Sequence, residues 1–315
     1  MRVNVQLIDA ENGNHLWAER FDKPLADLFD MQDEIVARLA NTLNAQLIVA
    51  EARRAEQASR IGNLDAFDLT MRGRALSFGF VQPTKENNLV LRAMYEQALA
   101  IDPNNAAALA ENAYTYGFDI FFGCMDPDID YSAKVLGQID RSITLARGDP
   151  RPYFLKSLYL AFTHRIDEAL RAADAGLAFN PNSASLHAAR GHAEIYIGNF
   201  ERGKADVQQA MRLSPRDPSL GGWHNFLCLA ELGLGRYDAA IGKAHDALDA
   251  VYRVFLVHAF LAAAHALKGE MAVAKTALAE ARRLNPKLTV KSMAERYGNI
   301  PTLLEGLRQA GLPEA

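Results

Sequence analysis

Histidine is the residue type in this sequence best suited to catalysis or metal binding, and there are eight of them. His187 and His192 are five residues apart, and His258 and His265 are seven apart. Neither pair has the four-residue step that places two ligands side by side on a helix, and no H-E-x-x-H motif occurs. Because His187, His224 and His258 recur at one position of a sequence repeat, we expect them to have packing roles.

Other candidate reactive groups are equally sparse. Cys124 and Cys228 are too few for a disulfide framework and too far apart for a C-x2-C metal site, so we expect buried thiols. The acidic stretch 125–130 alternates carboxylates as a calcium loop does, but it lacks the central glycine and the closing glutamate, which favours a solvated loop. Neither a phosphate-binding G-x-x-x-x-G-K-[ST] loop nor a G-x-S-x-G nucleophile elbow is present. We therefore predict no catalytic residue, no cofactor and no metal site in this chain.

Composition narrows the classes of partner. The 315 residues carry a net charge of -4, which argues against a nucleic-acid partner. No run of about 20 apolar residues occurs, so we expect no membrane span. The N-terminus lacks the apolar region of a signal peptide and begins inside a strand-like pattern. We therefore expect Met1 to be an internal start of a longer protein, with this part in the cytoplasm, or in the periplasm if the parent has an upstream membrane span.

Residues 1–58 combine a strand pattern with a helix pattern. Apolar and polar residues alternate weakly up to Phe21, and Asn12-Gly13 suits the type I′ turn of a β-hairpin. Apolar residues then follow helical spacing from Leu25 to Leu47, and residues 61–63 read as a linker. Because a two-stranded hairpin is marginal alone, we expect it either to pack on its own helix and the array behind it, or to pair with a second copy through its open edge as a homodimer.

The segment 65–286 repeats with a period near 34 residues, as shown by Pro181 and Pro215. The units share small residues at helix-crossing positions, a glycine turn and a closing Asn/Asp-Pro. An irregular insertion occurs at one place, residues 117–131. This combination is typical of about six tetratricopeptide repeats, each made of two antiparallel helices. The predicted fold is therefore mostly α, a tetratricopeptide-repeat right-handed superhelix (an α-solenoid) preceded by a β-hairpin and helix, with capping helices at 287–315.

The first helix of each repeat lines the concave face of such a superhelix, where peptides bind. We therefore predict a groove for a protein or peptide partner. An equally open alternative is that several groove residues are buried against the insertion or the N-terminal helix. By repeat register the groove residues are Tyr114, Phe118, Phe154, Leu158, Phe162, His192, Tyr196, Asn225 and Leu229.

Both ends of the chain resemble a bacterial signalling family. The runs Arg2–Ala10, Gly13–Asp22 and Leu28–Ile35 resemble the end of a TolB-like domain, and Leu303–Pro313 resembles the closing segment of members linked to class III adenylate/guanylate cyclases. The resemblance implies a non-catalytic regulatory region of a nucleotide cyclase-type protein whose catalytic domain lies upstream. The alternatives are the tail of a winged-helix transcriptional regulator and, less favoured, an enzyme with an unrecognised site.

Overall fold

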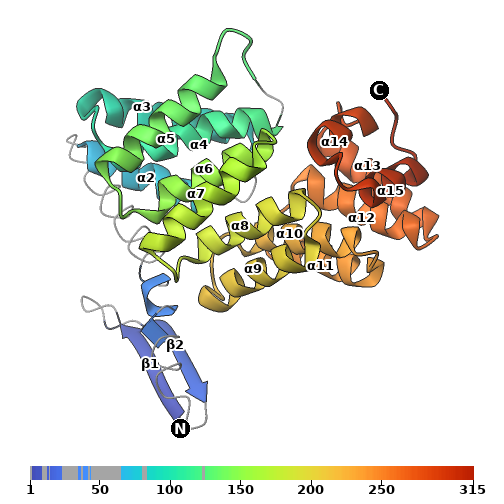
Figure 1. The fold of residues 1–315 in the computed structure, drawn as a ribbon, viewed down its shortest axis with the longest axis horizontal. Helices are drawn as coiled ribbons and strands as arrows, with labels where there is room; N and C mark the ends of the chain where they lie inside the picture. Colours follow the sequence, from blue (N-terminus) through green and yellow to red (C-terminus); the bar gives the residue numbers. More distant parts are fainter. Residues whose placement is uncertain are drawn as a thin grey trace.

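The computed structural model describes residues 2–8, 13, 15–22, 35–36, 38–41, 43, 65–79, 84–122 and 125–315. Two strands precede a long array of helices (Figure 1). In chain order the elements are β1 (Arg2–Ile8), β2 (His15–Asp22), α2 (Ala66–Gly79), α3 (Lys85–Ile101), α4 (Ala106–Phe122), α5 (Tyr131–Leu145), α6 (Pro150–Phe162), α7 (Ile166–Phe179), α8 (Ala184–Tyr196), α9 (Phe200–Leu213), α10 (Leu220–Gly233), α11 (Tyr237–Asp249), α12 (Phe255–Leu267), α13 (Met271–Leu284), α14 (Val290–Tyr297) and α15 (Pro301–Ala310).

The helices from α2 to α13 pack as successive pairs, and each pair stacks on the next. Figure 1 shows the array curving from α2 and α3, through α8 and α9, to α12 and α13. At the far end α15 packs back onto α12 beside α14. This arrangement confirms the predicted helical solenoid preceded by a hairpin.

Asn/Asp-Pro pairs in the turns that follow the helix pairs form hydrogen bonds. In each case the side-chain Oδ1 accepts a hydrogen bond from the backbone N–H two residues on, which holds the chain in a turn beside the proline. The donor and acceptor are 2.9 to 3.2 Å apart. The acceptors are Asp102, Asp149, Asn180, Asp217 and Asn285.

Glycine makes the turn inside three of the helix pairs. Gly198, Gly235 and Gly269 have φ values of 85°, 71° and 82°, a left-handed conformation that glycine adopts without steric cost. At the equivalent position between α6 and α7 the residue is His164, with φ of 59°. A side chain other than glycine is strained there, so neighbouring contacts must hold it.

Small residues let the paired helices approach closely. Ala169, Ala210, Ala240 and Ala274 are fully buried, as their predicted crossing positions require. One close crossing joins α8 to α9, where a Cβ added at Gly191 would lie 2.6 Å from the backbone oxygen of Gly203. Even one methyl group would therefore push these two helices apart.

The predicted hairpin is present as an antiparallel pair with Val3 opposite Phe21. Phe21 is buried against Val3, Val5, Ile35 and Leu39, so one face of the hairpin packs on helical residues that follow it. The side chain of Asn41 donates a hydrogen bond of 3.1 Å to the backbone oxygen of Asn182, between α7 and α8. These contacts match the first of the two expected packing arrangements.

Several sequence expectations fall outside the described residues. Asn12 of the turn, most of the helix predicted over 25–47, the linker at 61–63 and Cys124 are among them. The insertion at 117–131 is partly helical: α4 has 17 residues, whereas α6 and α8 have 13 each. Asp130 then caps α5 by accepting a hydrogen bond of 3.0 Å from Ala133, so this carboxylate has a local structural role.

We predict that Gly191→Ala lowers the free energy of unfolding by about 1–3 kcal/mol, because overpacking at the crossing outweighs alanine's better helix propensity. Urea unfolding followed by circular dichroism measures the change. Gly242→Ala on α11 is the matched control, since a Cβ there meets no atom within 4 Å, and it should raise stability by up to about 1 kcal/mol. Equal effects of the two substitutions would contradict the crossing argument.

Candidate functional site

The inner face of the solenoid contains an apolar cavity of about 140 Å³. Its walls come from the first helices of successive pairs, α4, α6, α8, α10 and α12, with further residues from α5 and α14. Side chains far apart in the sequence therefore converge on one site. Six of the nine predicted groove residues line it: Tyr114, Phe118, Leu158, Phe162, His192 and Asn225.

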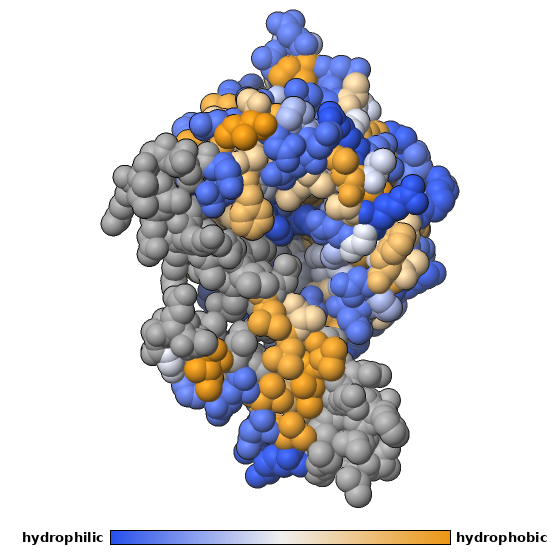
Figure 2. All heavy atoms as spheres, turned by 90° about the vertical axis from the view of Figure 1, so that its left-hand side faces the viewer, coloured by the Kyte–Doolittle hydropathy of each residue, from blue (hydrophilic) through white to orange (hydrophobic). Residues whose placement is uncertain are grey.

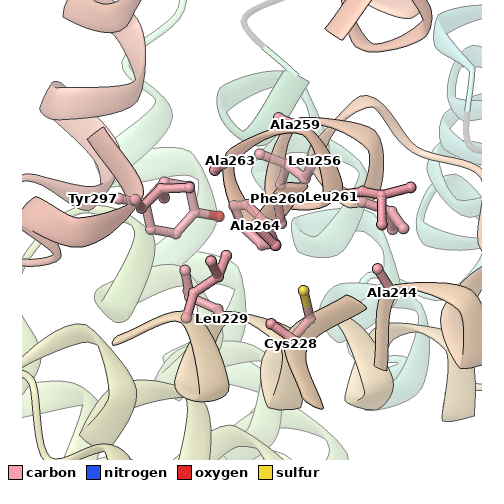
Figure 3. Close-up of a cluster of buried hydrophobic side chains, with 14 of the residues drawn as sticks. Cys228, Leu229, Ala244, Leu256, Ala259, Phe260, Leu261, Ala263, Ala264 and Tyr297 are labelled. Carbon is pink, nitrogen blue, oxygen red and sulfur yellow. The ribbon is translucent and has the colours of Figure 1, made fainter. Parts of the chain in front are cut away.

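The other three predicted groove residues lie elsewhere. Phe154 lies beneath the guanidinium group of Arg151, 5.3 Å from its ring centroid. Tyr196 is 3% exposed and borders a second hollow beside α14 instead. Leu229 is 1% exposed and belongs to the hydrophobic core; Figure 3 shows it close to Phe260. Repeat register predicts which face of a helix points inward, but not how deeply a neighbouring helix covers it.

Besides tyrosines, the polar residues that line the cavity are His192 and Asn225, which are 1% and 4% exposed. In the part of the chain that the structure describes, His192 Nδ1 and Asn225 Oδ1 have no hydrogen-bond partner. Burial, together with the positive charge of Arg296, lowers the pKa of His192 to about 3. The imidazole is therefore neutral at pH 7.

Aromatic rings hold this imidazole in place. The ring of Phe226 stacks on it with centroids 4.1 Å apart, and Tyr196 and Phe162 meet it edge-on at 4.6 and 5.3 Å. Burial also raises the pKa of Tyr114 and of Tyr297, which line the same cavity. All of these groups are uncharged at neutral pH.

Helix α14, the last but one in the chain, closes one side of the site. Tyr297 lines the cavity, and Arg296 lies over the ring of Phe121 on α4, 4.7 Å from its centroid. His164 Nε2 lies 2.5 Å from the backbone oxygen of Glu295, a contact that holds the strained turn between α6 and α7. Among the described residues, α14 therefore covers one side of the cavity, and Gly117, Phe118 and Phe121 of the insertion also line it.

Sequence reasoning missed Tyr252, Phe226 and Tyr297, which also line the cavity. Tyr252 stands where its repeat lacks the usual closing proline, so the break in pattern was a usable signal. Phe226 adjoins the predicted Asn225. Tyr297 lies beyond the repeats and had no register from which to place it.

A buried ion cluster connects the inner helices at the N-terminal end of the solenoid. Glu111 on α4 lies 2.9 Å from Arg151 and 3.3 Å from Arg74. Burial alone would raise the pKa of Glu111, but the two guanidinium groups bring it below its usual value. Arg151 also lies over the rings of Tyr114 and Phe154, so the cluster fixes one rim of the inner face.

The repeated histidines lie between paired helices. His187 Nδ1 on α8 is 3.8 Å from an oxygen of Asp206 on α9. His224 Nδ1 on α10 is 3.4 Å from an oxygen of Asp246 on α11. Across the described residues, no group of three or more His, Cys, Asp or Glu side chains is placed to hold a metal ion. Cys228 is buried, and burial raises the pKa of its thiol.

None of the helices in the described ranges is long and apolar enough to cross a bilayer.

Comparison with known proteins supports the fold and identifies a relative of part of the sequence. No protein-family profile matches the sequence. The chain is 31% identical over 172 residues to a putative adenylate cyclase 3 of Rhizobium meliloti, an alignment that covers 55% of this chain and 29% of that protein. The similarity therefore spans less than a third of the relative's length.

Three solved structures share the architecture at low sequence identity. A tetratricopeptide-repeat protein from Parabacteroides merdae has a TM-score of 0.51 at 12% identity, covering 89% of this chain and 98% of that one. The Cut9–Hcn1 hetero-tetramer of the APC/C has a TM-score of 0.60 at 15% sequence identity. The match covers 87% of this chain and 47% of that one. Human IFIT1, solved as a dimer with m7Gppp-AAAA, has a TM-score of 0.60 at 13% sequence identity. The match covers 88% of this chain and 67% of that one.

The helix pairing, the repeat turns and these neighbours define the chain's fold as a tetratricopeptide-repeat solenoid. It is a helical repeat protein with a hairpin at its N-terminal end.

We predict that His192 makes the protein less stable in mild acid. The unfolded chain takes up a proton as the pH falls through 6.5, whereas folded His192 does so only near pH 3. The contribution of neutral His192 to the free energy of unfolding is therefore fully present above pH 6.5. This contribution is lost as the pH falls from 6.5 towards 3. Between pH 6.5 and 4.5 the wild type should lose about 2.5 kcal/mol more than His192→Phe, as measured by urea unfolding.

His245→Gln is the control for this comparison, because His245 is exposed on α11. Its stability should follow the wild-type pH profile. Parallel pH profiles for the wild type and His192→Phe would show that His192 does not have the lowered pKa.

Proposed function

We propose that this chain is a non-catalytic scaffold that binds a protein or peptide on the inner face of its solenoid. The observation that carries the proposal is the convergence of six predicted groove residues from α4, α6, α8 and α10 on one apolar cavity. Aromatic walls with a few polar groups are typical of sites that anchor a partner's apolar side chain. The exposed rim supplies the remaining contact surface.

We further propose that the scaffold is the regulatory region of a nucleotide cyclase-type signalling protein. The similarity to the Rhizobium meliloti protein supports this role, as do the TolB-like and cyclase-linked segments at the two ends. The upstream reading frame discriminates the alternatives, because it would encode a cyclase domain in one case and a winged-helix domain in the other. Cyclic-nucleotide formation by this chain alone from ATP or GTP would instead support the enzyme alternative.

A homodimer through the hairpin is proposed as a second interaction. Within the described residues β1 and β2 pair only with each other, so each strand has an open edge. Figure 2 shows hydrophobic atoms gathered at the lower end of the molecule, where Figure 1 places the hairpin. Ile8 and Val36 are 49% and 57% exposed in this region. Pairing of two hairpins would cover both the edges and this apolar surface.

Replacing Leu158 by lysine tests the inner-face proposal. Peptides selected by display against the wild-type chain should bind Leu158→Lys at least tenfold more weakly in calorimetry, because an unpaired ammonium group would enter an apolar site. Leu145→Lys is the matched control, since Leu145 lies 45% exposed on α5 outside the cavity. Equal affinities for both variants would reject the inner face as the binding surface.

Removal of residues 1–22 tests the dimer. Light scattering after size-exclusion chromatography should give twice the chain mass for the full chain and the single-chain mass for the truncated one, because the truncation removes both strand edges. A monomeric full chain at concentrations of about 100 μM would refute the dimer, since stable homodimers of this kind form well below it.

A further inference from the structure

The size of the inner cavity matches a single ring. Its volume of about 140 Å³ is close to that of engineered protein cavities of about 150 Å³ that bind benzene. A peptide backbone does not fit in such a volume, but one ring does. The occupant is therefore a small molecule or one side chain.

The lining sets the charge of the occupant. None of the residues that line the cavity carries a charge at neutral pH, since the pKa of His192 is far below 7 and burial raises the pKa of Tyr114, Tyr252 and Tyr297. An ionised ligand would lose its hydration without gaining a counter-charge from the walls. An uncharged ligand avoids that penalty.

Two polar atoms set where the ligand's polar group must lie. His192 Nδ1 and Asn225 Oδ1 are buried without a hydrogen-bond partner among the described residues, although both side chains line the cavity. Buried polar atoms in proteins nearly always form hydrogen bonds. Two such atoms without a hydrogen bond at one cavity therefore indicate that a ligand supplies the hydrogen-bonding group. The neighbouring rings of Phe226, Phe162 and Tyr196 hold the imidazole firmly enough for it to select that partner.

We propose that the cavity binds an uncharged, ring-sized aromatic group that carries a hydroxyl or similar hydrogen-bonding substituent, with the ring against the apolar walls and the substituent at His192 and Asn225. This ring is either a free small molecule or the side chain of a bound partner. The proposal stands apart from the scaffold function, because a free ring binds whether or not a protein partner does.

Phenol is the probe for this site. Calorimetry and saturation-transfer NMR with the full chain should show saturable binding of one phenol with a Kd below about 1 mM. Toluene, which lacks the hydroxyl, and benzoate, which is charged, should each bind at least about tenfold more weakly. Absence of saturable phenol binding, as expected if the cavity holds only water, would overturn the proposal.

A matched pair of glycine variants tests the location. Gly117 lines the cavity, and a Cβ added there meets no atom within 4 Å, so Gly117→Leu should fill the cavity without disturbing the helix. Gly242 on α11 is equally open but lies away from the cavity. Gly117→Leu should abolish phenol binding and Gly242→Leu should retain it, and phenol binding that survives Gly117→Leu would refute the assignment.

The hydrogen-bonding role is tested separately. His192→Phe should weaken phenol at least about tenfold while leaving toluene unchanged, whereas a merely structural defect would weaken both and would reject the role of His192. N-acetyltyrosine amide distinguishes the two sources of the ring. Competition with phenol by this amide assigns the site to a partner's side chain, and phenol binding without amide binding assigns it to a free molecule.

Discussion

The structure depends above all on the close approach of paired helices at small residues. Gly191 and Gly203 leave room for backbone contact between α8 and α9, and alanines such as Ala210 and Ala274 are completely buried at equivalent crossings. Close spacing within each pair allows successive pairs to stack side by side, as they do from α2 to α13. This constraint explains the many alanines at the crossings, because larger side chains there would separate the helices.

The same spacing creates the inner-face cavity. Since successive first helices are held side by side, residues about 34 positions apart, such as Leu158 and His192, face one space. Among the described residues, α14 closes one side of the cavity, with Tyr297 in the wall and Arg296 against Phe121. His164 connects this closure to the repeats, since its left-handed backbone is held by contact with Glu295. The strained turn and α14 thus support each other.

Charge is distributed so that the site itself stays neutral. The buried cluster of Glu111, Arg74 and Arg151 lies at the N-terminal end of the inner face, where Arg151 donates two hydrogen bonds to Glu111 and Arg74 forms an ion pair with it. Such a cluster adds little net stability because desolvation offsets the attraction, but it fixes the relative positions of α2, α4 and α6. His192 follows the opposite rule: surrounded by rings, it stays uncharged and keeps a nitrogen available for hydrogen bonding.

The sequence by itself determined the elements and their register. The 34-residue period, the glycine turns at Gly198 and Gly235 and the Asx-Pro closures depend on local backbone chemistry, so they could be predicted, and with them which helix faces point inward. Only the tertiary structure decided how deeply each inward residue lies: Leu229 is core, Phe154 lies under Arg151, and Tyr252 and Tyr297 join the wall. Burial depth depends on neighbours distant in sequence, above all on α14, and repeat periodicity carries no information about a helix that lies outside the repeats.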